Sequence, residues 1–584
     1  MRMIRNFMAY AVLALFSVPA LAAADWVAQS DALTAKRLEV DAAFVPEGAA
    51  RTGLEGYDEK IMDLRPGYKE RYENALREVL AAYEKALKTE ENANVRQDLR
   101  ILIEDTRQTI DIGNLYDRHM IDYYNLPRAI FGATRAMLDP QVDESRHPAA
   151  LARLRKYTGM TEGFVPLFEH AKRETAKDLE NPELLGPYVK ELEKDLENMP
   201  RFVAGVRELF ANSDVEGWEP AVATFEEQVN DYAAWLREHL APRARESFRL
   251  PREIYAANLK LFGTDMDPEQ LISRATSGFM SIRLNMEAIA RQIAEERGFE
   301  SADYRDVIRE LKKEQFSSEN ILDAYKARLE EIEAIVEAND IVTLPEREAI
   351  IRLASPAESA AQPAPHMQPP RMIGNTGERG AFVLPLNNPN ADSDAKMDDF
   401  LNDAIAWSLT VHEARPGHEM QFAKMIENGV SQARMLYAFN SANVEGWGLY
   451  AEAIMLPYLP LEGQLMSLQM RLMRAARAFL DPMLNLGMID YARARDFLMK
   501  EVVLSEPMAT QEVDRYTFRA PGQATAYYFG YMKLQELRAK TELALRDRFD
   551  QQEFHDFILA QGLLPPDLMA EAVMEEFVEP RLEE

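Results

Sequence analysis

Apolar residues recur at helical spacing through most of this chain, and this pattern limits the fold more than any other feature of the sequence. Along Tyr72–Leu87 and again along Leu322–Val336, apolar side chains repeat on one helix face, with charged residues between them. Glycine and proline supply only 26 and 31 of the 584 residues, which favours long helices over many tight turns. We therefore expect a mostly α-helical protein.

The composition excludes several classes of protein. Hydrophobic residues make up 47% of the chain, which is ordinary for a globular protein and rules out a wholly disordered or fibrous chain. The 97 acidic and 67 basic side chains give a formal net charge of -30. Because so acidic a surface repels phosphate backbones, we do not expect nucleic acid as a partner.

Residues 1–22 have the pattern of a secretory signal peptide. Arg2 and Arg5 form a basic start, Phe7–Phe16 is apolar, and Ala20–Ala22 offers small residues for cleavage. An uncleaved anchor is the alternative, but the apolar run is short for a bilayer span. The chain has no cysteine, so neither a lipid-anchoring cysteine nor a disulfide is expected. We expect a periplasmic or secreted protein that leaves the membrane once the signal is removed.

The chain divides into three further regions. Residues 23–340 are expected to form a helical N-terminal region, and residues 391–584 a helical catalytic region. Between them, residues 341–390 are expected to form a small sheet and a Pro/Gly-rich loop, with strands at 350–353 and 381–384. Five prolines between positions 356 and 370 argue against a helix there. Residues 23–584 together are expected to form one large globular unit.

The middle region has two interpretations. It is either a linker between domains or a small sheet beside an active site, where an extended substrate pairs with an edge strand. We favour the second interpretation, because the residues suited to catalysis follow soon afterwards.

Two of the eight histidines bracket the segment His412-Glu413-Ala414-Arg415-Pro416-Gly417-His418. Paired imidazoles beside a carboxylate suit Zn²⁺, which prefers nitrogen ligands. Six residues of unbroken helix turn by about 600° and would put His418 on a different face from His412. Pro416 clashes with the carbonyl of His412, and Gly417 tolerates unusual dihedrals. We therefore predict a break that returns His418 to the metal held by His412.

Two glutamates further along the chain complete this predicted site. A catalytic zinc usually has three protein ligands, and Glu445, about 30 residues on, is the candidate third ligand. Glu452, seven residues later, is expected to hold a ligand histidine by its far nitrogen. Glu413 is the candidate general base that takes a proton from a water. The alternative is that Glu445 and Glu452 are exposed acids of one helix.

A third segment offers groups that could bind the substrate. Pro521 is expected to start a helix, which would place Gln523 and Tyr527 one turn apart on one face. A tyrosine hydroxyl and an amide are suitable donors to an oxyanion, and Arg515 and Arg519 could hold a substrate carboxylate. Alternatively, the two arginines pair with acids of this acidic protein.

Taken together, His412–Gln421, Glu445-Gly446-Trp447 and Pro521–Ala524 with Tyr527 resemble the DUF885 family of bacterial proteins. The resemblance implies a mostly helical, metallopeptidase-like fold, similar to the thimet oligopeptidase and M32 carboxypeptidase group. It also implies His412, His418 and Glu445 as metal ligands and Glu413 as the base. The chain departs from the pattern in carrying Tyr527-Tyr528 where one tyrosine is expected, so either could face the site.

The sequence therefore predicts an exported, gluzincin-like zinc metallopeptidase. It would hold one Zn²⁺ and cleave peptide or related amide bonds, with a metal-bound water as nucleophile, Glu413 as base and Tyr527 as oxyanion donor. The rivals are an amidase with a non-peptide substrate, a non-catalytic binding protein that contains a metal, and a protein whose histidines are ordinary core residues. Co²⁺ or Mn²⁺ in place of zinc also stays open.

Overall fold

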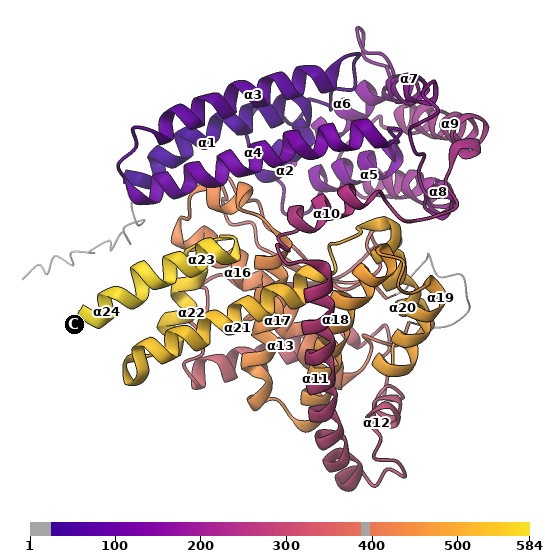
Figure 1. The fold of residues 1–584 in the computed structure, drawn as a ribbon. Coiled ribbons are helices and arrows are strands. Elements are labelled where there is room, and N and C mark those ends of the chain that lie inside the picture. Colours follow the sequence, from indigo (N-terminus) through magenta and orange to yellow (C-terminus); the bar gives the residue numbers. More distant parts are fainter. Residues whose placement is uncertain (1–24, 387–396, 584) are drawn as a thin grey trace, which may run out of the picture.

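The computed structural model describes residues 25–386 and 397–583, and their helices form two layers (Figure 1). The predicted signal peptide lies outside the described residues, as does the end of the predicted 341–390 region. The fold is mostly helical with one small sheet, which confirms the predicted fold class. Within the described ranges, no helix has both the length and the apolar character needed to cross a membrane.

The upper layer of Figure 1 holds the first ten α-helices, and the later helices lie largely below it. The first ten are α1 (Asp25–Phe44), α2 (Pro46–Thr52), α3 (Tyr68–Leu87), α4 (Ala93–His119), α5 (Leu126–Met137), α6 (Pro148–Tyr157), α7 (Leu167–Leu179), α8 (Val189–Ala211), α9 (Glu219–Trp235) and α10 (Arg252–Leu261).

The remaining α-helices are α11 (Pro268–Arg297), α12 (Tyr304–Leu311), α13 (Ile321–Ala338), α14 (Pro356–Ala361), α15 (Asp403–Leu409), α16 (His418–Asn428), α17 (Ser441–Met455), α18 (Leu461–Asn485), α19 (Tyr491–Phe497), α20 (Glu506–Asp514), α21 (Thr525–Leu545), α22 (Gln551–Ala560), α23 (Pro566–Ala572) and α24 (Glu579–Glu583). Short 3₁₀ or π-helical turns are η1 (Glu144–Arg146), η2 (Leu236–Leu240), η3 (Ala241–Arg243), η4 (Thr410–Ala414), η5 (Ala433–Tyr437), η6 (Leu456–Tyr458), η7 (Leu498–Val502), η8 (Arg515–Arg519), η9 (Arg546–Arg548) and η10 (Val573–Val578).

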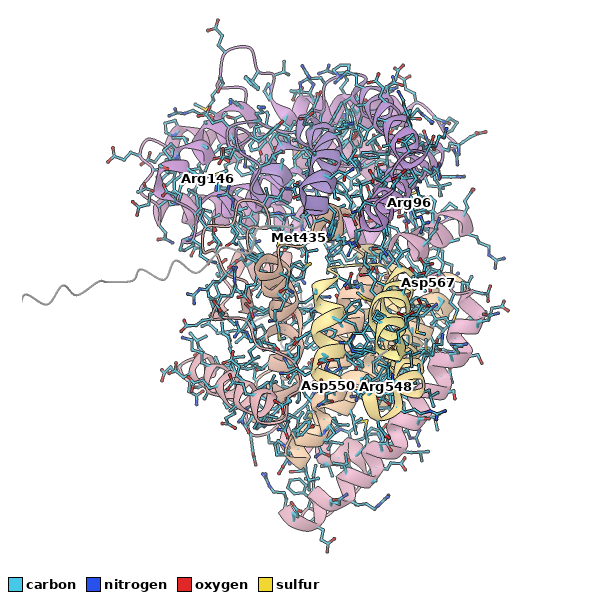
Figure 2. The ribbon with its side chains drawn as sticks, turned by 90° about the vertical axis from the view of Figure 1, so that its left-hand side faces the viewer. Arg96, Arg146, Met435, Arg548, Asp550 and Asp567 are labelled. Atoms are coloured by element: carbon cyan, nitrogen blue, oxygen red, sulfur yellow. The ribbon has the colours of Figure 1, made fainter. Side chains whose placement is uncertain are left out.

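Each layer has a large hydrophobic core, and both apolar and polar side chains meet at the junction. One core gathers mainly apolar side chains between residues 50 and 240, and another gathers those between residues 271 and 529. Ile101 of α4 packs with the lower layer, and Ala433 of η5 packs with the upper one. At the junction, Arg434 of η5 donates from Nε to Asp98 of α4 at 2.8 Å, and both side chains are buried. Figure 2 shows the neighbouring Met435 at this junction, with Arg146 above it. How the chain divides into folding units stays a prediction.

The small sheet has three strands in the order β1-β3-β2. β1 (Ile350–Leu353) and β3 (Ala381–Leu384) have the predicted bounds and pair in parallel. β2 (His366–Gln368), which the sequence analysis missed, pairs antiparallel with β3 and leaves its other edge without a strand among the described residues. β2 and β3 both lie against η4, the turn that carries His412.

The prediction that prolines exclude a helix from this region was wrong. Pro356 occupies the first turn of α14, where a missing N–H costs nothing, and so it starts the helix. Ser355 and Glu358 form a capping box, in which each side chain accepts a hydrogen bond from the other residue's backbone N–H. Whether a helix forms here therefore depends on the position of Pro356 in its first turn more than on the number of prolines in the segment.

Glycines let α17 and α21 pack closely enough to share one site. A Cβ at Gly530 would lie 1.8 Å from the carbonyl oxygen of Ala442, and a Cβ at Gly446 would lie 2.7 Å from the carbonyl carbon of Gly530. No side chain larger than hydrogen fits at this crossing without displacing a helix. The contact holds Glu445 of α17 beside the helix that carries Tyr527.

Gly530→Ala is expected to destabilise the protein by about 1–3 kcal/mol, because the added methyl group forces the two helices apart. Gly113→Ala in α4 is the matched control, since a Cβ there meets no atom within 4 Å. It is expected to stabilise by up to about 1 kcal/mol, because glycine is a poor helix former. Thermal unfolding measures both, and a melting temperature for Gly530→Ala at or above that of the control would contradict the packing argument.

Candidate metal centre

The chain between the two histidines leaves the helix and re-enters it, as the sequence predicts. η4, a π-helical turn that continues α15, ends at Ala414, and α16 begins at His418. A Cβ at Gly417 would lie 2.1 Å from the carbonyl oxygen of His412, so only glycine allows this close return. The segment between them, Arg415–Gly417, is called the return turn below.

Three neighbouring elements hold the return turn. Arg415 donates from Nε to Glu419 of α16 at 2.8 Å and from Nη1 to Glu333 of α13 at 2.6 Å. Trp447 of α17 donates its indole N–H to the carbonyl oxygen of Pro416 at 2.9 Å. These partners explain why arginine stands inside the first motif and tryptophan directly follows Glu445-Gly446.

The return turn brings His418 back beside His412, and α17 adds Glu445. The Nε2 atom of His418 lies 3.2 Å from Oε2 of Glu445, and Nε2 of His412 lies 3.5 Å from the same oxygen. One ligand atom from each residue lies within 4.8 Å of the other two. Both histidines are buried and Glu445 is partly exposed, so these three residues could hold a metal ion. His412, His418 and Glu445 are called the metal group below.

The pKa shifts of Glu445 and His412 fit a cation between them. Burial alone would raise the pKa of Glu445, but hydrogen bonds from His412 and His418 hold it well below its ordinary value. Burial alone would lower the pKa of His412, but Glu445 and Glu452 outweigh that effect and raise it to about 9. A partly buried carboxylate facing two imidazoles favours a positive charge between them, and a metal ion can replace the proton.

Two further residues orient His412. Nδ1 of His412 lies 2.8 Å from Oε1 of the buried Glu452, which also accepts a hydrogen bond from Ser408 at 3.0 Å. This places Glu452 at the far nitrogen of the ring, where the sequence analysis expects it. Gly448 of α17 packs against both imidazole rings. A Cβ there would lie 2.7 Å from Cε1 of His412 and 2.9 Å from Cε1 of His418. The rings therefore fit into a notch that only glycine leaves open.

Glu413 directly follows His412 in η4 and is buried. This turn lies against β2 and β3 of the sheet. The side chain of His366, on β2, is close enough to Glu413 for the two charges to interact, although burial is the larger influence and lowers the pKa of His366. Sequence reasoning missed His366, because it lies outside any motif and in a segment expected to be loop.

Tyr527, rather than Tyr528, faces the metal group. Its ring stacks against His412 at 6.4 Å between centroids, and its hydroxyl oxygen accepts a hydrogen bond from Arg515 at 2.7 Å. Arg515 also donates to Gln523, so these three predicted residues lie together. The Tyr528 ring instead contacts Tyr531.

Two other expectations for residues 515–527 concern Pro521 and Arg519. Pro521 does not start a helix: residues 521–524 form a turn and α21 begins at Thr525. Arg519 forms an ion pair with Asp195 of α8 at 2.6 Å, as in the alternative interpretation. A substrate role for Arg515, Arg519 or Gln523 stays a prediction.

Buried charges on α18 support this segment and were missed. Asp481 accepts hydrogen bonds from the backbone N–H of Gly522 at 3.0 Å and from the Tyr255 hydroxyl at 2.9 Å, which fixes the 521–524 turn. Arg477 lies 4.4 Å from the Tyr527 ring centroid and is paired with Glu512. These residues sit in a helix without a short motif, so the only signal available was the unusual charge on a buried face.

Comparisons with known proteins agree on the family and the fold. The family model described as "Bacterial protein of unknown function (DUF885)" matches residues 46–573, which confirms the resemblance drawn from the motifs. A "putative lipoprotein" from Colwellia psychrerythraea is similar in structure, with 18% identity, a TM-score of 0.75, and coverage of 94% of this chain and 97% of that one. A "putative lipoprotein of unknown function" from Shewanella oneidensis has 19% identity, a TM-score of 0.70, and coverage of 95% and 100%. No curated protein sequence matches the chain.

Metal binding is expected to release about one proton at neutral pH. Because the pKa of His412 is raised to about 9, its ring is protonated below that pH in the metal-free protein, whereas a metal ligand must be neutral. Affinity should therefore rise with pH until about pH 9. Isothermal titration calorimetry with Zn²⁺ at about pH 7, in buffers of different ionisation enthalpy, gives the number of protons released on binding. Identical binding heats in all buffers would contradict the expectation.

Gly448→Ala is expected to weaken Zn²⁺ binding by about 10–100-fold, the range seen when groups that orient ligands are changed. The new methyl group would push both imidazoles away from Glu445. Competition with a chromogenic chelator gives the affinity, and Gly113→Ala again serves as the control. Wild-type affinity in Gly448→Ala would show that the notch does not position the rings.

Proposed function

We propose that this chain, which belongs to the DUF885 family, is an exported metal-dependent hydrolase of peptide or related amide bonds. The single observation that carries the proposal is the convergence of His412, His418 and Glu445. A further carboxylate that is not needed as a ligand, Glu413, directly follows His412 in the chain. Two imidazoles and one carboxylate are the donor set of many catalytic zinc sites, so Zn²⁺ is the proposed ion.

A divalent cation bound there supplies Lewis acidity, which polarises a carbonyl oxygen and lowers the pKa of a water. Glu413 directly follows His412 in the chain and is buried, and we assign to it the acceptance of a proton from the attacking water. The same carboxyl group then delivers that proton to the leaving amine. Both transfers require that the Glu413 carboxylate reach the attacking water and the nitrogen atom of the same scissile bond.

Tyr527 supports the proposal as a neutral hydrogen-bond donor. Burial raises its pKa, and this outweighs the opposing effect of Arg515, so the phenol keeps its proton. Arg515 donates to the phenol oxygen, which leaves the hydroxyl hydrogen free to point toward a substrate oxyanion. Arg477 and Arg515, both within about 5 Å of the ring centroid, add positive charge on that side.

Among the described residues no strand pairs with the outer edge of β2, and this free edge favours a peptide over a compact amide. β2 lies against η4, and one of its residues, His366, interacts with Glu413. An extended peptide can add to such an edge through main-chain hydrogen bonds, which a non-peptide amide cannot do. The predicted signal peptide and the description of two similar structures as "putative lipoprotein" support export.

Glu413→Gln tests the proposal. Gln cannot take up a proton, so cleavage of a mixed peptide library by the Zn²⁺-loaded protein is expected to slow by about 10²–10⁴-fold, with metal content unchanged. Glu575→Gln makes the same chemical change at an exposed position of η10 and should retain wild-type activity. Mass spectrometry of the products gives the rates.

Two results would count against the proposal in different ways. Full activity in Glu413→Gln would remove Glu413 as the base. A wild-type protein that binds Zn²⁺ but cleaves no peptide would remove the peptidase assignment and leave an amidase or a non-catalytic metal protein.

A further inference from the structure

A cavity of about 620 Å³ lies between the two layers, beside the sheet. Its walls come from α2, α5 and the segment from Asp139 to the end of η1 on one side, and from β2 and the residues that follow it on the other. Arg146 and Met435, both in its lining, lie on opposite sides of the layer junction in Figure 2. Seven arginines but only four acidic residues line it, although the whole chain carries a net charge of -30.

Most of these arginines already have partners, but Arg51 does not. Arg146 forms a two-pronged ion pair with Asp58, and Arg135 pairs with Glu358 at 2.7 Å. In the described part of the chain, the guanidinium of Arg51 has neither a hydrogen bond nor an ion pair. The residue is exposed to solvent at the cavity, and its surroundings and the positive charge of Arg135 lower its pKa. The cavity therefore offers one guanidinium whose hydrogen-bond donors are available to a bound anion.

The cavity extends along β2 from the neighbourhood of Glu413. β2 lies against η4, the turn that carries Glu413, and two residues on one face of β2, His366 and Gln368, line the cavity. The Oε1 atom of Gln368 accepts a hydrogen bond from Arg135 at 3.1 Å, so this end of the strand reaches the arginines. A peptide paired with β2 would advance about 3.3 Å per residue from Glu413 toward them.

We infer that this cavity binds a carboxylate of the substrate, a few residues from the scissile bond, and that Arg51 is its principal partner. The inference rests on the proposed function and adds a substrate class: extended peptides with an acidic end. The carboxylate is either the free C-terminus or an acidic side chain, which share the same chemistry. Arginine suits this role because its planar guanidinium can bind a carboxylate through two hydrogen bonds.

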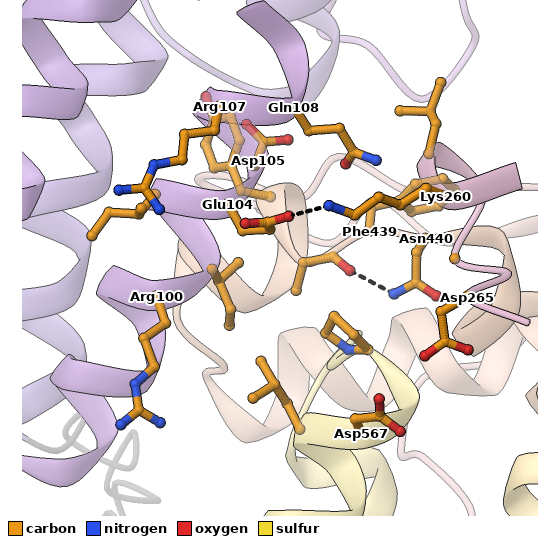
Figure 3. A pocket seen from close by; sticks show the side chains of 18 of the residues that line it. Arg100, Glu104, Asp105, Arg107, Gln108, Lys260, Asp265, Phe439, Asn440 and Asp567 are labelled. Carbon is orange, nitrogen blue, oxygen red and sulfur yellow. Dashed lines mark hydrogen bonds and ion pairs between the residues drawn. The ribbon is translucent and has the colours of Figure 1, made fainter. Parts of the chain in front are cut away.

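A second, larger cavity of about 910 Å³ does not have this character (Figure 3). Its charged lining residues are of both signs, and Lys260 is paired with Glu104 at 2.8 Å. Phe439 borders both cavities, but this one includes neither β2 nor His366 in its lining. Arg100, in its wall, therefore provides a control for changing an arginine away from the sheet.

The test compares matched peptides with Arg51 variants. The probes are Ala-Leu-Phe-Ala-Ala-Glu and Ala-Leu-Phe-Ala-Ala-Gln, each as the free acid and as the C-terminal amide. Arg51→Met is expected to lower kcat/KM by about tenfold for the peptide that carries the recognised carboxylate, and Arg51→Lys by less. Arg100→Met should leave every rate unchanged. The free-acid and amide pairs, and the Glu and Gln pairs, identify which carboxylate is bound.

Binding is measured separately, by fluorescence anisotropy of labelled peptides with the Zn²⁺-loaded Glu413→Gln protein. Selective weakening in Arg51→Met supports the inference even if no peptide is cleaved, so failure of the hydrolase assignment would be distinguished from failure of the cavity assignment. Equal affinity for acidic and neutral peptides, or an equal loss for all of them in Arg51→Met, would overturn the inference.

Discussion

The return turn at Arg415–Gly417 is the constraint on which the rest of the site depends. Unless the chain leaves the helix there, two imidazoles six residues apart cannot face one point. The turn needs a glycine, because the carbonyl oxygen of His412 occupies the space of a Cβ at Gly417. It also needs an external hold, which the indole of Trp447 and the two acids around Arg415 provide. His412, His418 and Glu445 are thus brought together by residues outside that group.

Close approach of backbones and burial of charge work together around this turn. Gly446, Gly448 and Gly530 remove side chains where α17 must meet α21 and the imidazoles. Buried ion pairs, such as Arg477 with Glu512, then surround Tyr527. Pairs of this kind contribute little net stability, because desolvation offsets their attraction, but they fix side chains in one arrangement. Here they keep the Tyr527 phenol and the Arg515 guanidinium in place beside the metal group.

The sequence predicted the parts of the structure that follow local rules. Helical periodicity, strands β1 and β3 and the break before His418 could be predicted because each depends on a few adjacent residues. The α14 helix was missed because proline was counted rather than placed, and β2 because three residues carry too little pattern. His366, Asp481 and Arg51 owe their positions to contacts with residues far along the chain, so no spacing rule identifies them. The acidic composition also concealed a basic cavity, since net charge does not say how charges are distributed.

The most direct test of this account is a crystal structure of the Zn²⁺-loaded protein, with anomalous diffraction recorded on both sides of the zinc absorption edge. The account predicts one strong peak bounded by Nε2 of His412, Nε2 of His418 and a carboxylate oxygen of Glu445, at bond lengths of about 2.0–2.2 Å. A zinc peak at some other place, with these three side chains turned away from one another, would contradict it.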